Sequence, residues 1–178
     1  RAELRFDHDD ETHATTFSRV PTTIDRADLA ALTARASALA DDGRRILGIT
    51  GPPGAGKSTV AGDIVAALAP SAVLVPMDGF HLAQAELDRL GRDDRKGAID
   101  TFDGLGFVAL VRRLRAATED VYAPSFRRDL EEPIAGAIHV AGNVPLVVLE
   151  GNYLLAGEPP WSSLRALIDD VWYLAPDR

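Results

Sequence analysis

The chain has 178 residues, of which 46% are hydrophobic and 26% are charged, and these shares are close to those of globular proteins. That length suits one domain with its own core and is short for two. Acidic residues outnumber basic ones by 27 to 19, and the resulting formal charge of −8 argues against nucleic acid or an anionic membrane surface as the main partner.

The N-terminal stretch carries no clear periodicity, and we interpret residues 1–24 as an acidic extension in front of one domain at 25–178. Several acids and histidines gather in it: Asp7, His8, Asp9, Asp10, Glu11 and His13. Such residues are able to bind a metal ion, but an acidic tail that contains histidine is more often simply solvated.

The rest of the chain alternates between apolar runs and helical patterns. Strands are predicted at 45–50, 72–75, 134–140, 145–149 and 171–174, and helices at 25–41, 60–68, 83–90, 104–117 and 161–168. The glycine-rich segment 51–59 is predicted as a turn, and the charged segment 91–103 as a loop. Short buried strands separated by helices predict an α/β domain with a parallel sheet covered on both faces.

Residues 51–58 match the phosphate-binding pattern G-x-x-x-x-G-K-[ST] at every fixed position, between a strand and a helix. Glycines let several backbone N–H groups point at one phosphate, and the positive end of the following helix adds to that field. Lys57 supplies a charge for the outer phosphates, and the Ser58 hydroxyl is a ligand for Mg²⁺. The predicted nucleotide-binding residues are Gly51, Pro53, Gly54, Ala55, Gly56, Lys57, Ser58 and Thr59.

Two acids stand directly after predicted strands. Asp78 follows the strand at 72–75, and Glu150 follows the strand at 145–149. Ligands of open α/β sheets lie at the carboxyl ends of the strands, so both acids should face the phosphate-binding turn. We assign Asp78 as the base toward an acceptor hydroxyl, with Lys57 as its catalytic partner, and Glu150 to the Mg²⁺ shell. The two acids could exchange these roles, or each could be a helix cap or a loop acid.

These segments, taken together, resemble the group of P-loop kinases that contains uridine kinase, phosphoribulokinase and bacterial pantothenate kinase, in the branch labelled nucleoside/nucleotide kinase-like or fructose-transport-system kinase. The matching segments are 51–59, Met77-Asp78-Gly79-Phe80-His81-Leu82, Arg95-Lys96-Gly97-Ala98, Asp100-Thr101-Phe102-Asp103, Pro124-Ser125-Phe126 and Leu149-Glu150-Gly151-Asn152-Tyr153. The resemblance implies a doubly wound parallel sheet flanked by helices, the P-loop NTPase fold.

The same resemblance implies an ATP-dependent kinase that transfers the γ-phosphate of Mg·ATP to a hydroxyl of a small molecule, with ATP and Mg²⁺ as cofactors. It implies that Phe80, His81, Arg95, Asp103 and Arg128 line the acceptor pocket. His81 could instead be a hydrogen-bonded core histidine, Arg95 and Lys96 a solvated surface, and Asp103 the cap of the helix that begins at Gly104. Members of the group carry a further lid and a last strand, which we expect to be missing from this chain. The acceptor, whether nucleoside, sugar or pantothenate-like, is left open.

Three other kinds of protein also contain a phosphate-binding turn and are alternatives to a kinase: a GTPase switch, a transport ATPase and a non-catalytic or regulatory nucleotide-binding module. A GTPase switch would need a D-x-x-G motif after an apolar strand and an N-K-x-D guanine motif. The segment Asp103-Gly104-Leu105-Gly106 fits D-x-x-G but follows no apolar strand, and no N-K-x-D motif occurs. A transport ATPase would need an L-S-G-G-Q-like segment, which is also missing from the sequence. The chain has no cysteine and no apolar run of transmembrane length, so we expect a cytoplasmic protein without disulfides. The sequence carries no mark of oligomeric state, and a homodimer stays open.

Overall fold

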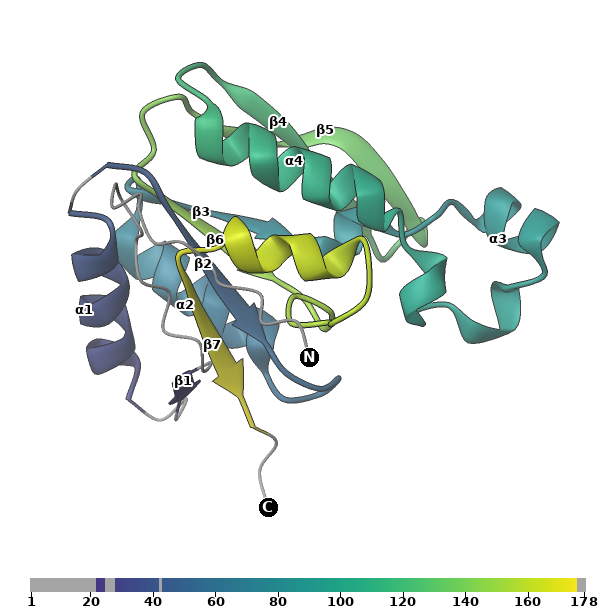
Figure 1. Cartoon of the computed structure of the whole chain (residues 1–178), viewed down its shortest axis with the longest axis horizontal. Helices are drawn as coiled ribbons and strands as arrows, with labels where there is room; N and C mark the ends of the chain where they lie inside the picture. The colour runs from purple at the N-terminus through teal and green to yellow at the C-terminus, as the bar shows by residue number, and fades with distance from the viewer. Residues whose placement is uncertain (1–21, 25–27, 42, 176–178) are drawn as a thin grey trace, which may run out of the picture.

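The computed structural model describes residues 22–24, 28–41 and 43–175. Its main sheet has five strands, all parallel, in the order β1-β7-β2-β6-β3 (Figure 1). These strands are β1 (Thr22–Ile24), β2 (Arg45–Thr50), β3 (Ala72–Pro76), β6 (Leu146–Glu150) and β7 (Asp170–Leu174). The predicted parallel sheet is therefore confirmed. A separate antiparallel hairpin consists of β4 (Val121–Arg127) and β5 (Glu132–Val140).

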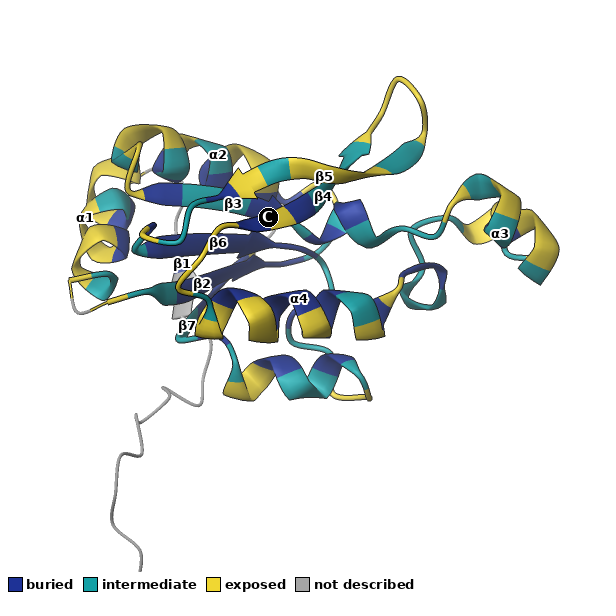
Figure 2. Ribbon diagram, turned by 90° about the horizontal axis from the view of Figure 1, so that it is seen from above, coloured by how far each residue is buried: buried dark blue, intermediate teal, exposed yellow. Residues whose placement is uncertain are grey.

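Helices cover both faces of the main sheet, as Figure 2 shows. One face carries α1 (Leu29–Leu39) and α2 (Lys57–Leu68); the other carries α4 (Gly104–Ala116) and the 3₁₀ helix η4 (Trp161–Ala166). The short helix α3 (Gln84–Leu90) projects from one end of the sheet, followed by the 3₁₀ turns η2 (Asp93–Arg95) and η3 (Ile99–Thr101). The doubly wound arrangement expected for this sequence is thus present.

The two faces of the sheet build two hydrophobic cores. On one face, Phe107, Val111 and Leu114 recur at helical spacing along α4 and are fully buried. On the other face, Val60 and Ile64 of α2 are buried against the sheet. Every residue of β6 is buried, which explains why its sequence is a continuous apolar run rather than an alternating one.

Two features of the fold were not predicted. Strand β1 pairs with β7 but lies inside the segment that we interpreted as an extension, because three residues without alternation give no strand signal. Strand β4 contains Pro124 and mixes apolar with polar side chains, so the sequence did not mark it as the partner of β5. The acidic residues 7–13 lie outside the described residues.

A close backbone contact at Gly79 holds the hairpin against the end of β3. Gly79 lies in the 3₁₀ turn η1 (Met77–Phe80), and an added Cβ would overlap the Pro124 carbonyl oxygen and stand 2.7 Å from its carbon. We expect Gly79→Ala to lower the free energy of unfolding by about 1–3 kcal/mol, measured by denaturant titration. Gly62 of α2 has no atom within 4 Å of such a Cβ. Gly62→Ala is the matched control and should raise stability by up to about 1 kcal/mol; equal losses in both variants would contradict this account.

Candidate active site

The register of the sheet brings three chain segments to one edge. Strand β6 lies between β2 and β3, and the Cα of Glu150 pairs with Ile49 on one side and Pro76 on the other. The phosphate-binding turn begins directly after β2, and Asp78 stands two residues after β3. The turn, Asp78 and Glu150 therefore meet at the carboxyl edge of the sheet, as in other open α/β proteins.

The phosphate-binding turn has the backbone shape that its glycines predict. Gly54 and Gly56 adopt φ values of +78° and +85°, which side chains with a Cβ rarely tolerate. Helix α2 begins at Lys57 directly after Gly56, so its N-terminus faces the turn. The Lys57 ammonium folds back onto the turn and donates a hydrogen bond of 2.9 Å to the Pro52 carbonyl oxygen.

Charge is concentrated where the turn meets the strand ends. Glu150 is only 7% exposed, and burial together with the nearby charge of Asp78 raises its pKa. The Lys57 charge, a hydrogen bond from Ser58 and the Arg128 charge partly offset this rise. Burial lowers the pKa of Lys57, which is 6% exposed, and the charges of Glu150 and Asp78 oppose that decrease. Two acids and one ammonium thus share a poorly solvated site.

The donor set at this edge suits Mg²⁺. The Ser58 hydroxyl and the Glu150 carboxylate are hydrogen-bonded neighbours, and both offer the hard oxygen ligands that Mg²⁺ prefers. Among the residues that the structure describes, no three His, Cys, Asp or Glu side chains gather closely enough to hold a metal ion by themselves. The site therefore fits an ion that completes its shell with phosphate oxygens and water, and which would neutralise charge on the transferring phosphate.

A cavity of about 510 Å³, which we name the acceptor cavity, adjoins Asp78 and the turn. Its walls come from the turn, both strand ends, the 91–103 segment and the hairpin. The lining residues are Pro53, Asp78, His81, Lys96, Gly97, Phe102, Phe126, Arg128, Glu131 and Asn152. A cavity of this size accommodates a small metabolite.

Two of the five predicted acceptor residues, His81 and Arg128, lie on this cavity. His81 Nδ1 is 2.8 Å from the backbone oxygen of Asp78, and its ring lies 4.1 Å from Phe102 and 4.8 Å from Phe126 between centroids. Arg128 Nη2 is 3.9 Å from the Asp78 carboxylate, and its side chain is 83% exposed. The structure thus places a guanidinium within ion-pair reach of the predicted base.

The other three predicted acceptor residues, Phe80, Arg95 and Asp103, are not among those that line the acceptor cavity. Phe80 turns toward the core, where its ring meets Phe107 edge-on at 5.2 Å. Arg95 forms an exposed ion pair with Asp100 at 2.8 Å. Asp103 accepts a hydrogen bond of 2.8 Å from Gly106 N as the N-cap of α4, the alternative role that the sequence allowed.

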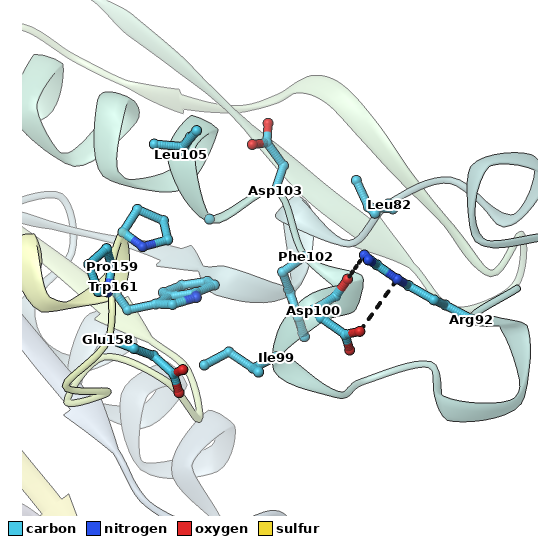
Figure 3. A pocket seen from close by; sticks show the side chains of 12 residues that line it. Leu82, Arg92, Ile99, Asp100, Phe102, Asp103, Leu105, Glu158, Pro159 and Trp161 are labelled. Atoms are coloured by element: carbon cyan, nitrogen blue, oxygen red, sulfur yellow. Dashed lines mark hydrogen bonds and ion pairs between the residues drawn. The ribbon is translucent and has the colours of Figure 1, made fainter. Parts of the chain in front are cut away.

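Asp103 instead borders a second cavity of about 460 Å³, and Phe102 lines this cavity as well as the acceptor cavity (Figure 3). Trp161, Pro159 and Ile99 line its apolar part. Near its rim, Arg92 donates a hydrogen bond of 2.6 Å to the Asp100 backbone oxygen. Tyr122 lies on the hairpin, 57% exposed, and lines neither cavity.

The acceptor cavity also contains residues that the sequence reasoning did not select. Phe102, Phe126 and Asn152 belong to the motifs that carried the family resemblance, but their side chains had no assigned role. For Lys96, as for Arg95, the sequence leaves both a substrate contact and a solvated surface open. Glu131 gave no signal, because only the folding of the hairpin brings its turn to the cavity.

Burial of Glu150 makes the stability of the nucleotide-free protein depend on pH. Since its folded pKa is raised above the ordinary 4.5, ionisation destabilises the folded state increasingly as pH rises through the raised value. Gln at this position cannot ionise. We therefore expect the Tm of Glu150→Gln to exceed that of the wild type at neutral pH, with the difference shrinking as pH falls toward 4.5 in thermal unfolding scans. A difference of constant size or opposite sign would contradict this electrostatic account.

Comparison with known proteins yields relatives by sequence and structure, although no family model matches the chain. A crystal structure described as a "putative fructose transport system kinase" from Silicibacter sp. TM1040 superposes with a TM-score of 0.73 at 39% sequence identity, over 82% of this chain and 73% of that one. The "putative uridine kinase C227.14" of Schizosaccharomyces pombe is 37% identical over 74% of this chain. The pantothenate kinase of Rhodococcus opacus is 30% identical over 71% of it.

The chain belongs to the uridine kinase and pantothenate kinase group of P-loop kinases. It spans 60% of the length of the S. pombe protein and 41% of the length of the R. opacus enzyme. Within the described part of the chain, no helix has both the length and the apolar character needed to cross a membrane.

Proposed function

We propose that the protein is an ATP-dependent kinase that transfers the γ-phosphate of Mg·ATP to a hydroxyl group of a small metabolite. The observation that carries the proposal is the meeting of Asp78, Glu150 and Lys57 at one sheet edge, between the phosphate-binding turn and the acceptor cavity. A nucleotide-binding module without catalysis needs the phosphate-binding turn, but it does not need an acid such as Asp78 beside the acceptor cavity.

The reaction divides among residues as follows. The backbone N–H groups of the turn and the Lys57 ammonium hold the phosphates of ATP. Asp78 accepts the proton of the acceptor hydroxyl while the hydroxyl oxygen forms a bond to the γ-phosphorus of ATP. The bond between that phosphorus and the oxygen that bridges it to ADP breaks, and ADP leaves. Ser58 and Glu150 would hold Mg²⁺, which would neutralise charge on the phosphates, and Arg128, next to Asp78, meets the negative charge of the transferring phosphate.

A screen of the full-length protein tests this function. ADP production is measured with Mg·ATP alone and with each member of a panel of metabolite alcohols that includes nucleosides, sugars and hydroxy acids. A kinase gives turnover that depends on one acceptor or a few related ones. Slow hydrolysis of the same rate with every acceptor would indicate a switch or NTPase, and nucleotide binding without ADP production would indicate a non-catalytic module.

A further inference from the structure

Lys96 places a mostly buried positive charge on the wall of the acceptor cavity, and the proposed phosphate transfer gives it no task. Its side chain is only 20% exposed. The ammonium donates hydrogen bonds of 2.7 Å to the Glu131 backbone oxygen and 3.3 Å to Gln84 Oε1, and it lies 5.3 Å from the centroid of the Phe126 ring. All three partners are uncharged.

The charge of Lys96 is only weakly balanced within the described residues. Its one acidic contact is Glu131 Oε2 at 3.6 Å, beyond hydrogen-bond distance, on a side chain that is 66% exposed. Ion pairs of this exposed kind contribute little. A desolvated ammonium gains most from a counter-charge that reaches it directly, and the open side of Lys96 is the acceptor cavity.

The segment that carries Lys96 is fixed in place rather than loose. The Tyr153 hydroxyl, at the end of β6, donates a hydrogen bond of 2.8 Å to the Gly97 carbonyl oxygen, and Gly97 N donates one of 3.0 Å to the Thr101 hydroxyl. The contact between Lys96 and Glu131 ties the same segment to the hairpin. The cation is therefore positioned before any ligand arrives, which favours its use in recognition.

Two neighbouring arginines of the hairpin, Arg127 and Arg128, differ in whether they line the cavity. Arg127 is satisfied by Asp129 through two hydrogen bonds of 2.8 and 2.6 Å, and it does not line the cavity. Arg128 does line the cavity, and its Nη2 lies 3.9 Å from the Asp78 carboxylate. The cavity is thus lined by Lys96 and Arg128, whose ion pairs among the described residues are long, at 3.6 and 3.9 Å, and it also contains the aromatic rings of Phe102 and Phe126.

We infer that the acceptor is an alcohol that carries a carboxylate or a phosphate group, and that Lys96 determines this preference by pairing with the anionic group. The inference rests on the proposed function and narrows its acceptor. The rings of Phe102 and Phe126 cover the less polar part of such a molecule, while its hydroxyl faces Asp78.

Matched pairs of acceptors test the inference. Glycerate with glycerol and pantothenate with pantothenol probe a carboxylate, and ribose 5-phosphate with ribose probes a phosphate, within a broader panel sorted by charge. We expect the anionic member of the active pair to have a kcat/KM at least about tenfold higher than the neutral one. Which pair is active distinguishes a carboxylate from a phosphate.

The variant Lys96→Gln retains an N–H donor for the Glu131 carbonyl but removes the charge. It should lower kcat/KM for the anionic acceptor by about 10- to 100-fold, mainly through KM, and leave the neutral acceptor within about threefold. Arg127→Gln is the matched control on the same hairpin, since it removes a cation that already has a partner, and it should leave the preference unchanged.

Different failures point to different conclusions. Faster turnover of neutral acceptors, an unchanged preference in Lys96→Gln, or equal losses for both acceptors in that variant would overturn the inference and leave the kinase function standing. If Mg·ATP binds but no acceptor of either charge produces ADP, the proposed function fails, and the inference fails with it.

Discussion

Replacement of Asp78 by Asn is expected to reduce acceptor-dependent ADP formation by about 10²- to 10⁴-fold, the range for loss of a positioned general base. Asn has the shape of Asp but cannot accept the proton of the acceptor hydroxyl. The Asp78 charge is also one cause of the raised pKa of Glu150, so its removal should bring that pKa closer to the ordinary value. The folded structure should persist, because the Asp78 contacts that position His81 use the backbone oxygen.

Two measurements distinguish a lost base from a damaged site. Calorimetric titration of Asp78→Asn with Mg·ATP should give a Kd within about threefold of the wild type, because the phosphates bind to the turn rather than to Asp78. Asp63→Asn, which changes an exposed acid on α2, serves as the control and should retain full turnover. Our assignment of the base is wrong if Asp78→Asn keeps wild-type turnover with any acceptor.

The nucleotide half of the site was predictable because its chemistry is local. The turn between Gly51 and Ser58 needs glycines at fixed positions, and the structure gives Gly54 and Gly56 the positive φ values that this requires. The acids were predictable for a related reason. A buried parallel strand appears in the sequence as an apolar run, so the first acids that follow the apolar runs of β3 and β6, Asp78 and Glu150, mark the sheet edge where ligands bind.

The acceptor half was only partly predictable, because adjacent residues there face different surroundings. Phe80 packs into the core while its neighbour His81 lines the cavity. Arg95 pairs with Asp100 at the surface while Lys96 reaches the cavity wall. Which of these side chains faces the core, the surface or the cavity depends on how the irregular segments pack against the hairpin. Irregular segments have no sequence periodicity, so the sequence does not predict this packing.

The hairpin formed by β4 and β5 shows that a whole strand can also escape prediction from the sequence. Strand β4 contains a proline and most of its residues are only partly buried or exposed, so it lacks the continuous apolar run of a core strand. Only pairing with β5 and the close approach of Pro124 to Gly79 bring Phe126 and Arg128 beside Asp78. The family motifs named these residues as important, but the geometry was needed to give them a place.

Replacement of Lys57 by Met is expected to weaken Mg·ATP binding and to lower turnover by at least about a hundredfold, as for loss of a pre-positioned charged donor. In the folded protein the buried ammonium lies between the fields of Glu150 and Asp78. Its removal leaves the two acids facing the triphosphate without the charge of the Lys57 ammonium. The pKa of Glu150 should then rise further, because the Lys57 charge is what chiefly holds that rise back.

Lys57→Arg separates charge from geometry at this position. It keeps the positive charge, so it should moderate the further rise in the Glu150 pKa, but a planar guanidinium cannot replace a compact ammonium that folds back 2.9 Å from the Pro52 carbonyl oxygen. Calorimetry with Mg·ATP and the ADP assay should therefore show both variants impaired, with Lys57→Met binding nucleotide more weakly than Lys57→Arg. Wild-type affinity for Mg·ATP and wild-type turnover in Lys57→Met would mean that Lys57 does not hold the phosphates of ATP, because a triphosphate brings to this edge several negative charges that the acids there repel.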